Sequence, residues 1–147
     1  MRIDLPDLAA MERFGARIAE QLRAGDAVAL SGTLGTGKTT LARAIIAALG
    51  HQGEVPSPTF TIIETYDPPS VRLPLVHADF YRLKHPDEAQ EIGLDDYRQG
   101  AVMIAEWPEM AGGFAHEPGC LSIALETAEM GRIAIVEPGA DWLGRLG

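Results

Sequence analysis

The stretch from Ala27 to Leu49 reads AVALSGTLGTGKTTLARAIIAAL and decides the fold. It matches the pattern G-x-x-x-x-G-K-[ST] without substitution, through Gly32, Gly35, Gly37, Lys38 and Thr39. An apolar run precedes this pattern and a helix-forming run follows it, closed by Gly50. In a strand–loop–helix unit the glycines let backbone N–H groups turn toward phosphates at the positive end of the helix. The stretch therefore predicts a phosphate-binding loop.

The last residues of the loop carry its side-chain chemistry. Lys38 is placed to reach the β- and γ-phosphates, and the Thr39 hydroxyl to ligate Mg²⁺, while Thr40 faces the helix or its neighbours. A glycine-rich turn that binds nothing is the alternative. A lysine followed by threonine at the correct step disfavours it, so we expect Mg-ATP or Mg-GTP as the ligand.

Length and composition restrict the remaining interpretations. The 147 residues suit a single domain, residues 1–147, which is short for a phosphate-loop enzyme with its own substrate domain. The chain has no run long enough to span a membrane, and acidic residues interrupt its first 25 positions, so we expect a cytoplasmic protein. The single cysteine, Cys120, is interpreted as a buried core thiol. The net charge of −9 argues against primary nucleic-acid binding, DNA included.

Hydrophobic periodicity predicts the element order. We expect an amphipathic helix from an Asp7 N-cap to about Leu22, a strand at Ala27–Leu30, and a helix from Thr39 to Leu49. Further strands are expected at 60–66, 71–78 (at an edge or with a late start, because of Pro74), 101–105, 121–125 and 132–137. A helical stretch over 86–99 is interrupted by glycine, and a brief helix ends the chain. This order predicts an α/β three-layer sandwich, a mixed sheet with helices on both faces.

Two acidic residues follow apolar strands and compete for the second metal-anchoring position. Glu106 ends the run Val102–Ala105 and ranks first; Asp79 is the alternative, with a further role in orienting water or as general base. His77 and His85 lack Cys or His partners at metal-ligand spacing and are interpreted as ordinary histidines.

The segment after the loop helix contains hydroxyl side chains where nucleotide switches sense the γ-phosphate. Ser57, Thr59 and Thr61 are equally compatible with such a switch and with turn chemistry imposed by the neighbouring prolines. Trp107 is either a core aromatic at a strand end or a flat surface beside the nucleotide.

Four blocks in order, GTLGTGKTT (32–40), VPSPTFTIIETY (55–66), HADFYRL (77–83) and IAEWPE (104–109), resemble the TsaE family, also called YjeE. The resemblance implies a small bacterial ATPase that supports the TsaB–TsaD heterodimer in threonylcarbamoylation of adenosine 37 in tRNA, with tRNA contact only through the complex and no membrane partner. It implies ATP and Mg²⁺ as cofactors, Thr39 and Glu106 as metal ligands, and Lys38, Asp79, Glu106 and Trp107 as the catalytic neighbourhood. The implied nucleotide contacts are Gly32, Gly35, Thr36, Gly37, Lys38, Thr39, Thr40, Ser57 and Thr59. Thr33 departs from the aspartate that is common in the family.

Two other functions use the same loop. A small-molecule kinase needs an acceptor pocket and an arginine-rich lid, for which the chain is short, and a non-hydrolysing docking module needs neither carboxylate. No arginine is clearly placed to accelerate hydrolysis, since Arg43 lies within the loop helix and Arg82 and Arg98 cannot be placed from spacing. We therefore expect slow hydrolysis by the isolated chain and acceleration by a partner.

Overall fold

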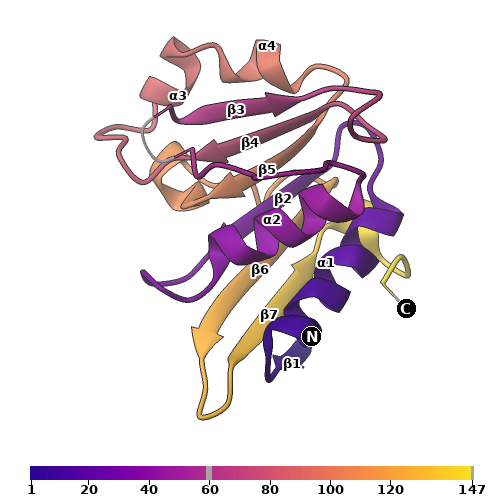
Figure 1. Ribbon diagram of the computed structural model, residues 1–147. Coiled ribbons are helices and arrows are strands. Elements are labelled where there is room, and N and C mark those ends of the chain that lie inside the picture. The colour runs from indigo at the N-terminus through magenta and orange to yellow at the C-terminus, as the bar shows by residue number, and fades with distance from the viewer. Residues whose placement is uncertain (59–60, 147) are drawn as a thin grey trace.

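The structure, a computed structural model, describes residues 1–58 and 61–146, and a mixed sheet runs through it (Figure 1). The strand order is β1-β7-β6-β2-β5-β4-β3. The strands are β1 (Arg2–Leu5), β2 (Ala27–Ser31), β3 (Ile63–Tyr66), β4 (Leu75–Asp79), β5 (Val102–Glu106), β6 (Cys120–Thr127) and β7 (Arg132–Pro138). The four central strands β6, β2, β5 and β4 are parallel, whereas β3 pairs antiparallel with β4, and β7 with both β6 and β1.

The helices α1 (Leu8–Gln21) and α2 (Lys38–Ala48) cover one face of the sheet (Figure 1). The Asp7 carboxylate accepts a hydrogen bond from the N–H of Ala10 at 2.8 Å, which caps α1 as predicted. Ile18 and Ile45 are fully buried between the helices and the sheet. Burial of a side chain of this size stabilises the fold by about 1.5–3 kcal/mol.

Alternation along β2 divides the core into two layers. Val28 and Leu30 face the two long helices, while Ala27 and Ala29 face the opposite layer, where small residues leave room for Phe80. That layer contains α3 (Glu88–Glu91), α4 (Leu94–Arg98) and the 3₁₀ turn η1 (Pro108–Ala111); a second 3₁₀ turn, η2 (Ala140–Trp142), lies near the end of the chain. The predicted three-layer mixed α/β fold is confirmed.

Cys120 is buried in the second layer, as its interpretation as a core thiol predicted. Burial raises the pKa of its thiol, so the sulfur stays protonated at neutral pH.

The structure decides several boundaries that the sequence left open. Of the two alternatives for the strand expected over 71–78, the late start is confirmed: β4 begins at Leu75, directly after Pro74. It is an interior strand and not an edge, because β3 pairs with its outer side. The interruption by glycine expected in the helical stretch over 86–99 is confirmed: Gly93 adopts a left-handed conformation and divides the stretch into two short helices. The expected strand over 60–66 is described only from Ile63, and Phe60 lies outside the described residues. Leu8 begins the apolar repeat that predicts the amphipathic helix, but it is 60% exposed, whereas Met11 and Phe14 of that repeat are buried.

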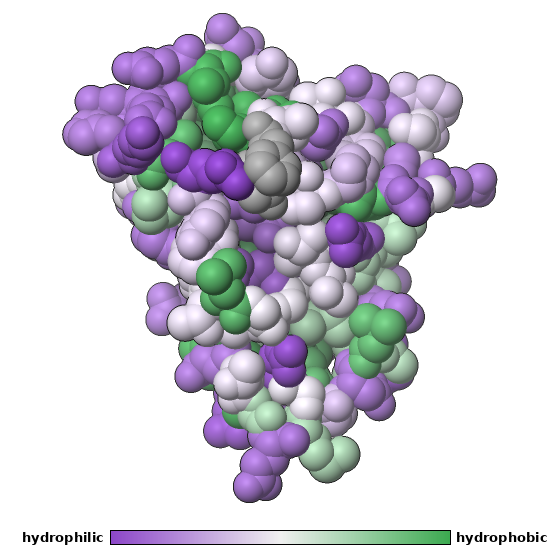
Figure 2. Space-filling model, turned by 60° about the vertical axis from the view of Figure 1, so that its left-hand side comes forward, coloured by the Kyte–Doolittle hydropathy of each residue, from purple (hydrophilic) through white to green (hydrophobic). Residues whose placement is uncertain are grey.

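The large apolar side chains that are exposed lie at separate positions along the described chain. On the face in Figure 2, hydrophobic side chains stand as separate patches among hydrophilic ones. The exposed large hydrophobics of the described residues come from separate segments: Met1, Leu8, Leu34, Tyr81, Tyr97, Met130 and Leu143. Within residues 1–58 and 61–146, none of the helices combines the length and apolar character that crossing a membrane requires.

Candidate nucleotide-binding site

The loop between β2 and α2 requires glycine for two physical reasons. Gly32, Gly35 and Gly37 have φ values of 137°, 79° and 100°, which L side chains rarely adopt. A Cβ at Gly32 would also lie 2.5 Å from a main-chain oxygen of β6. The Thr36 hydroxyl donates to the carbonyl of Thr33 at 2.9 Å and closes the loop into a turn.

The first turn of α2 begins directly where this loop ends. Gly37 occupies the N-cap position, and no side chain caps the helix there. The uncapped N–H groups and the dipole of this 11-residue helix place about half a positive charge at its start. This end of α2 is therefore a site that attracts an anion.

Lys38 is only 6% exposed, and its ammonium group is bonded to the loop. It donates to the carbonyls of Gly32 and Thr33, both at 2.8 Å, and lies 4.4 Å from the centre of the Trp107 ring. Burial lowers the pKa of Lys38, and the negative charges of Glu106, Glu109 and Asp79 oppose that shift. A cation held this way gains from any phosphate that takes the place of neutral carbonyls.

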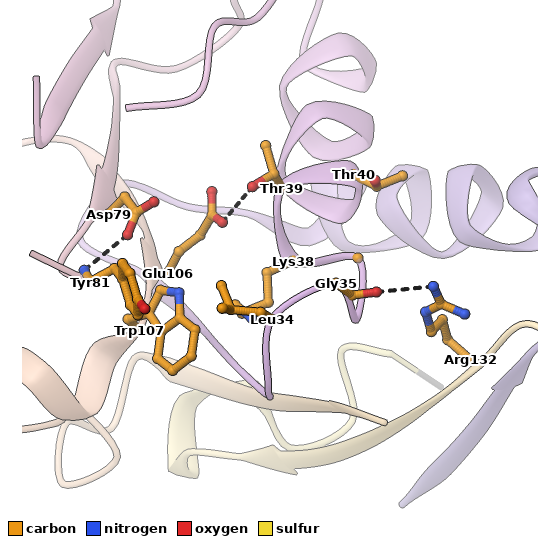
Figure 3. A pocket seen from close by; sticks show the side chains of 11 residues that line it. Leu34, Gly35, Lys38, Thr39, Thr40, Asp79, Tyr81, Glu106, Trp107 and Arg132 are labelled. Atoms are coloured by element: carbon orange, nitrogen blue, oxygen red, sulfur yellow. Dashed lines mark hydrogen bonds between the residues drawn. The ribbon is translucent and has the colours of Figure 1, made fainter. Parts of the chain in front are cut away.

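Glu106 accepts hydrogen bonds on both carboxylate oxygens. The Thr39 hydroxyl donates to Oε1 at 2.6 Å (Figure 3), and Nε2 of His77 lies 2.7 Å from Oε2. Both His77 and Glu106 are almost entirely buried, at 0% and 2% exposure. Nε2 carries the hydrogen that points to the carboxylate, so Nδ1 is the acceptor nitrogen of the ring. This buried Nδ1 has no hydrogen-bond partner among the described residues. The hydroxyl and the carboxylate proposed to share a metal thus already touch.

Asp79 lies beside Glu106 because β4 and β5 are parallel and in register at these two residues. Its Oδ1 accepts a hydrogen bond from the N–H of Tyr81 at 3.0 Å (Figure 3). Both carboxylates therefore end their strands at the same edge of the sheet as the phosphate loop, the position at which ligands bind in open α/β sheets.

The donor set fits Mg²⁺ that arrives with phosphate oxygens. Mg²⁺ takes six oxygen ligands and keeps several waters, so one hydroxyl and one or two carboxylates suffice when phosphates complete the shell. Thr39, Glu106 and Asp79 offer such oxygens. In the described part of the chain, no group of three His, Cys, Asp or Glu residues is arranged to hold a metal by itself.

Trp107 forms a wall of the pocket rather than part of the core. Its φ of 55° is a left-handed conformation that a bulky residue rarely adopts, and such conformations gather at functional sites. The side chain is half-buried and packs against Tyr81, with ring centres 4.8 Å apart and the ring planes inclined at 44°. Of the two alternatives from the sequence, the structure favours the flat surface beside the phosphate loop.

These groups line one pocket of about 410 Å³ (Figure 3). Its lining residues are Leu34, Gly35, Gly37, Lys38, Thr39, Thr40, Asp79, Tyr81, Glu106, Trp107 and Arg132. Ser57 is exposed and does not line it. Thr61 donates to Glu64 at 3.1 Å, as expected of turn chemistry, and Thr59 lies outside the described residues.

Sequence reasoning did not assign Leu34, Tyr81 or Arg132 to this pocket, nor His77 to the site behind it. The strand alternation that places His77 and Asp79 on one side of β4 could have suggested His77. Arg132 had no local signal, since it approaches from the far end of the chain. Of the arginines considered, Arg43 donates to the carbonyl of Val55, and Arg98 forms a two-bond ion pair with Glu117.

The fold and site define a class: an α/β protein with a phosphate-loop-like strand–loop–helix unit at the carboxyl edge of its sheet. Comparison with solved structures agrees. The crystal structure of YdiB from Bacillus subtilis superposes with a TM-score of 0.75 at 27% identity, covering 99% of this chain and 88% of that one.

The particular family follows from sequence comparison. The family model described as "Threonylcarbamoyl adenosine biosynthesis protein TsaE" matches residues 5–134. The tRNA threonylcarbamoyladenosine biosynthesis protein TsaE of Streptomyces coelicolor is 46% identical over 67% of this chain and 68% of its own. That of Haemophilus influenzae is 38% identical over 80% of this chain and 77% of its own. The chain belongs to the TsaE family.

Proposed function

We propose that this chain binds and hydrolyses Mg-ATP, and that this supports a TsaB–TsaD complex in threonylcarbamoylation of adenosine 37 in tRNA. The role in this tRNA modification rests on family membership, because the similar proteins carry that description. The ATPase activity rests on the site. The observation that carries it is the contact of Thr39 with Glu106 beside the buried ammonium of Lys38.

Each residue has a defined part in this proposal. The N–H groups at the start of α2 and the Lys38 ammonium bind the phosphates and stabilise the charge that develops during transfer to water. Thr39 and Glu106 would hold Mg²⁺, which would supply positive charge to neutralise the phosphates. Asp79 orients the attacking water from the neighbouring strand, and Trp107 with Tyr81 shields one side of the pocket.

A partner supplies what this chain lacks. Phosphoryl transfer is accelerated about 10³–10⁵-fold by an arginine that stabilises the transition state. Among the described residues, Arg132 is the arginine of the pocket, and each of its three guanidinium nitrogens already donates to a main-chain carbonyl. We therefore propose slow hydrolysis by the chain alone and stimulation by TsaB–TsaD. The net charge of −9 supports contact with tRNA through the complex rather than directly.

Phosphate release from Mg-ATP, measured with and without TsaB–TsaD, tests the proposal. We expect strong stimulation by the partners and its loss in Glu106→Gln, whereas Glu20→Gln, a control on the exposed face of α1, behaves as the unchanged chain. Nucleotide binding without phosphate release under any condition would instead favour the docking module. Phosphate transfer to an added nucleoside or sugar would favour the kinase.

A further inference from the structure

Arg132 reaches the phosphate loop because β7 runs antiparallel to β6. The first residue of an antiparallel strand lies at the edge where its parallel neighbours end, and this edge carries the loop that follows β2. The register places Arg132 between Leu5 of β1 and Thr127 of β6. The residue before it, Gly131, has φ 70° and would carry a Cβ only 2.2 Å from the carbonyl oxygen of Leu5. The approach of Arg132 is therefore set by backbone packing on both sides.

The guanidinium of Arg132 is bonded to the outer side of the loop (Figure 3). Nε donates to the carbonyl of Thr36 at 3.1 Å, Nη2 to that of Gly35 at 3.0 Å, and Nη1 to that of Gly131 at 2.9 Å. Within residues 1–58 and 61–146, no carboxylate forms an ion pair with it. A half-buried positive charge thus stands beside the loop without neutralisation.

The peptide units that Arg132 contacts also carry two N–H groups of the loop. In a planar trans peptide the C=O and N–H bonds point in opposite directions. A carbonyl of Gly35 held toward Arg132 therefore turns the N–H of Thr36 away from it, and the carbonyl of Thr36 does the same for the N–H of Gly37. Hydrogen bonding at the carbonyl also polarises the unit and strengthens its N–H as a donor.

We infer that Arg132 is a positioning residue for nucleotide binding: it holds the carbonyls of Gly35 and Thr36 outward so that the loop presents its N–H groups to the phosphates. The inference rests on the proposed binding of nucleotide to this loop. Arginine suits the task because its rigid fork spans two acceptors, which the single ammonium of a lysine cannot do with the same geometry. A nucleotide diphosphate and triphosphate share these loop contacts, so both depend on Arg132 equally.

The test measures the Kd of fluorescent ADP and ATP analogues for Arg132→Met and Arg132→Lys. The matched control is Arg72→Met, because Arg72 also donates to main-chain carbonyls, those of Ala19 and Leu22, but does not line the pocket. We expect Arg132→Met to raise both Kd values about tenfold or more and Arg132→Lys to recover part of the loss. Arg72→Met keeps the affinity of the unchanged chain.

Unfolding in urea without nucleotide separates positioning from structural damage. The inference is overturned if Arg132→Met binds both nucleotides as tightly as the unchanged chain, or if its affinity loss is matched by Arg72→Met. A loss confined to ATP overturns it as well, because Arg132 would then act on the γ-phosphate instead of on the loop. If Arg132→Met does not fold, the affinities of Arg132→Lys for both nucleotides are compared with those of the unchanged chain and of Arg72→Met instead. An unchanged chain that binds neither nucleotide overturns the proposed function itself, and this inference with it.

Discussion

Replacement of His77 by leucine tests whether the buried bond to Glu106 stabilises the site. The ring is fully buried and its Nε2 lies 2.7 Å from Oε2 of Glu106, which is itself 2% exposed. A hydrogen bond to a charged group contributes about 1.5–3 kcal/mol, and a carboxylate left with fewer donors adds a desolvation cost. We therefore expect His77→Leu to lower the free energy of unfolding by about 3 kcal/mol, or the midpoint temperature by about 6–12 °C.

His77→Gln is the matched variant, because the glutamine amide can donate from nearly the position of Nε2. We expect it to lose only about 1 kcal/mol. Urea unfolding of both variants, and of each combined with Glu106→Gln, gives the coupling energy between the two residues. Under the proposed hydrolysis of Mg-ATP, a misplaced carboxylate would also raise the Mg²⁺ concentration needed for half-maximal phosphate release, which supplies a second readout. A His77→Leu chain within 0.5 kcal/mol of the unchanged chain would refute the reasoning.

Three further predictions follow from single contacts. Gly32→Ala abolishes nucleotide binding and destabilises the chain by about 2 kcal/mol, checked by nucleotide titration and urea unfolding, because its Cβ would lie 2.5 Å from a main-chain oxygen at a φ of 137°. The hydrogen bond from Arg98 lowers the pKa of Glu117. The stability that this ion pair contributes is therefore complete above the ordinary value of 4.5 and is lost as the pH falls through the lowered pKa. Unfolding measured over an acid pH series detects this loss, and Glu117→Gln removes about 1 kcal/mol of the pH-dependent stability. In a Trp142→Phe chain, nucleotide binding changes the fluorescence of Trp107, the half-buried ring beside the phosphate loop, and an unchanged spectrum at saturating nucleotide would contradict that placement.

The core of the fold follows from local patterns, and its periphery does not. The α1 helix has a capping aspartate and an apolar stripe, and β2 is apolar from Ala27 to Leu30, so both are visible in a window of a few residues. The first strand, Arg2–Leu5, alternates polar and apolar residues over only four positions, and its place in the sheet depends on pairing with β7 more than a hundred residues later. The same holds for β4, whose interior position results from the pairing of β3 along its outer side.

The site divides in the same way, and for a physical reason. A phosphate-loop pattern specifies the groups that face the ligand, because those groups must follow one another along the chain. The positions of the groups behind them are set only by the tertiary structure. Glu106 is visible at a strand end, but its second partner, His77, requires the parallel register of β4 on β5. Arg132 requires more: β7 must reverse direction before its first residue can reach carbonyls 96 and 97 positions earlier. A motif therefore predicts what touches the phosphates, whereas the order and direction of the strands decide what holds those groups in place.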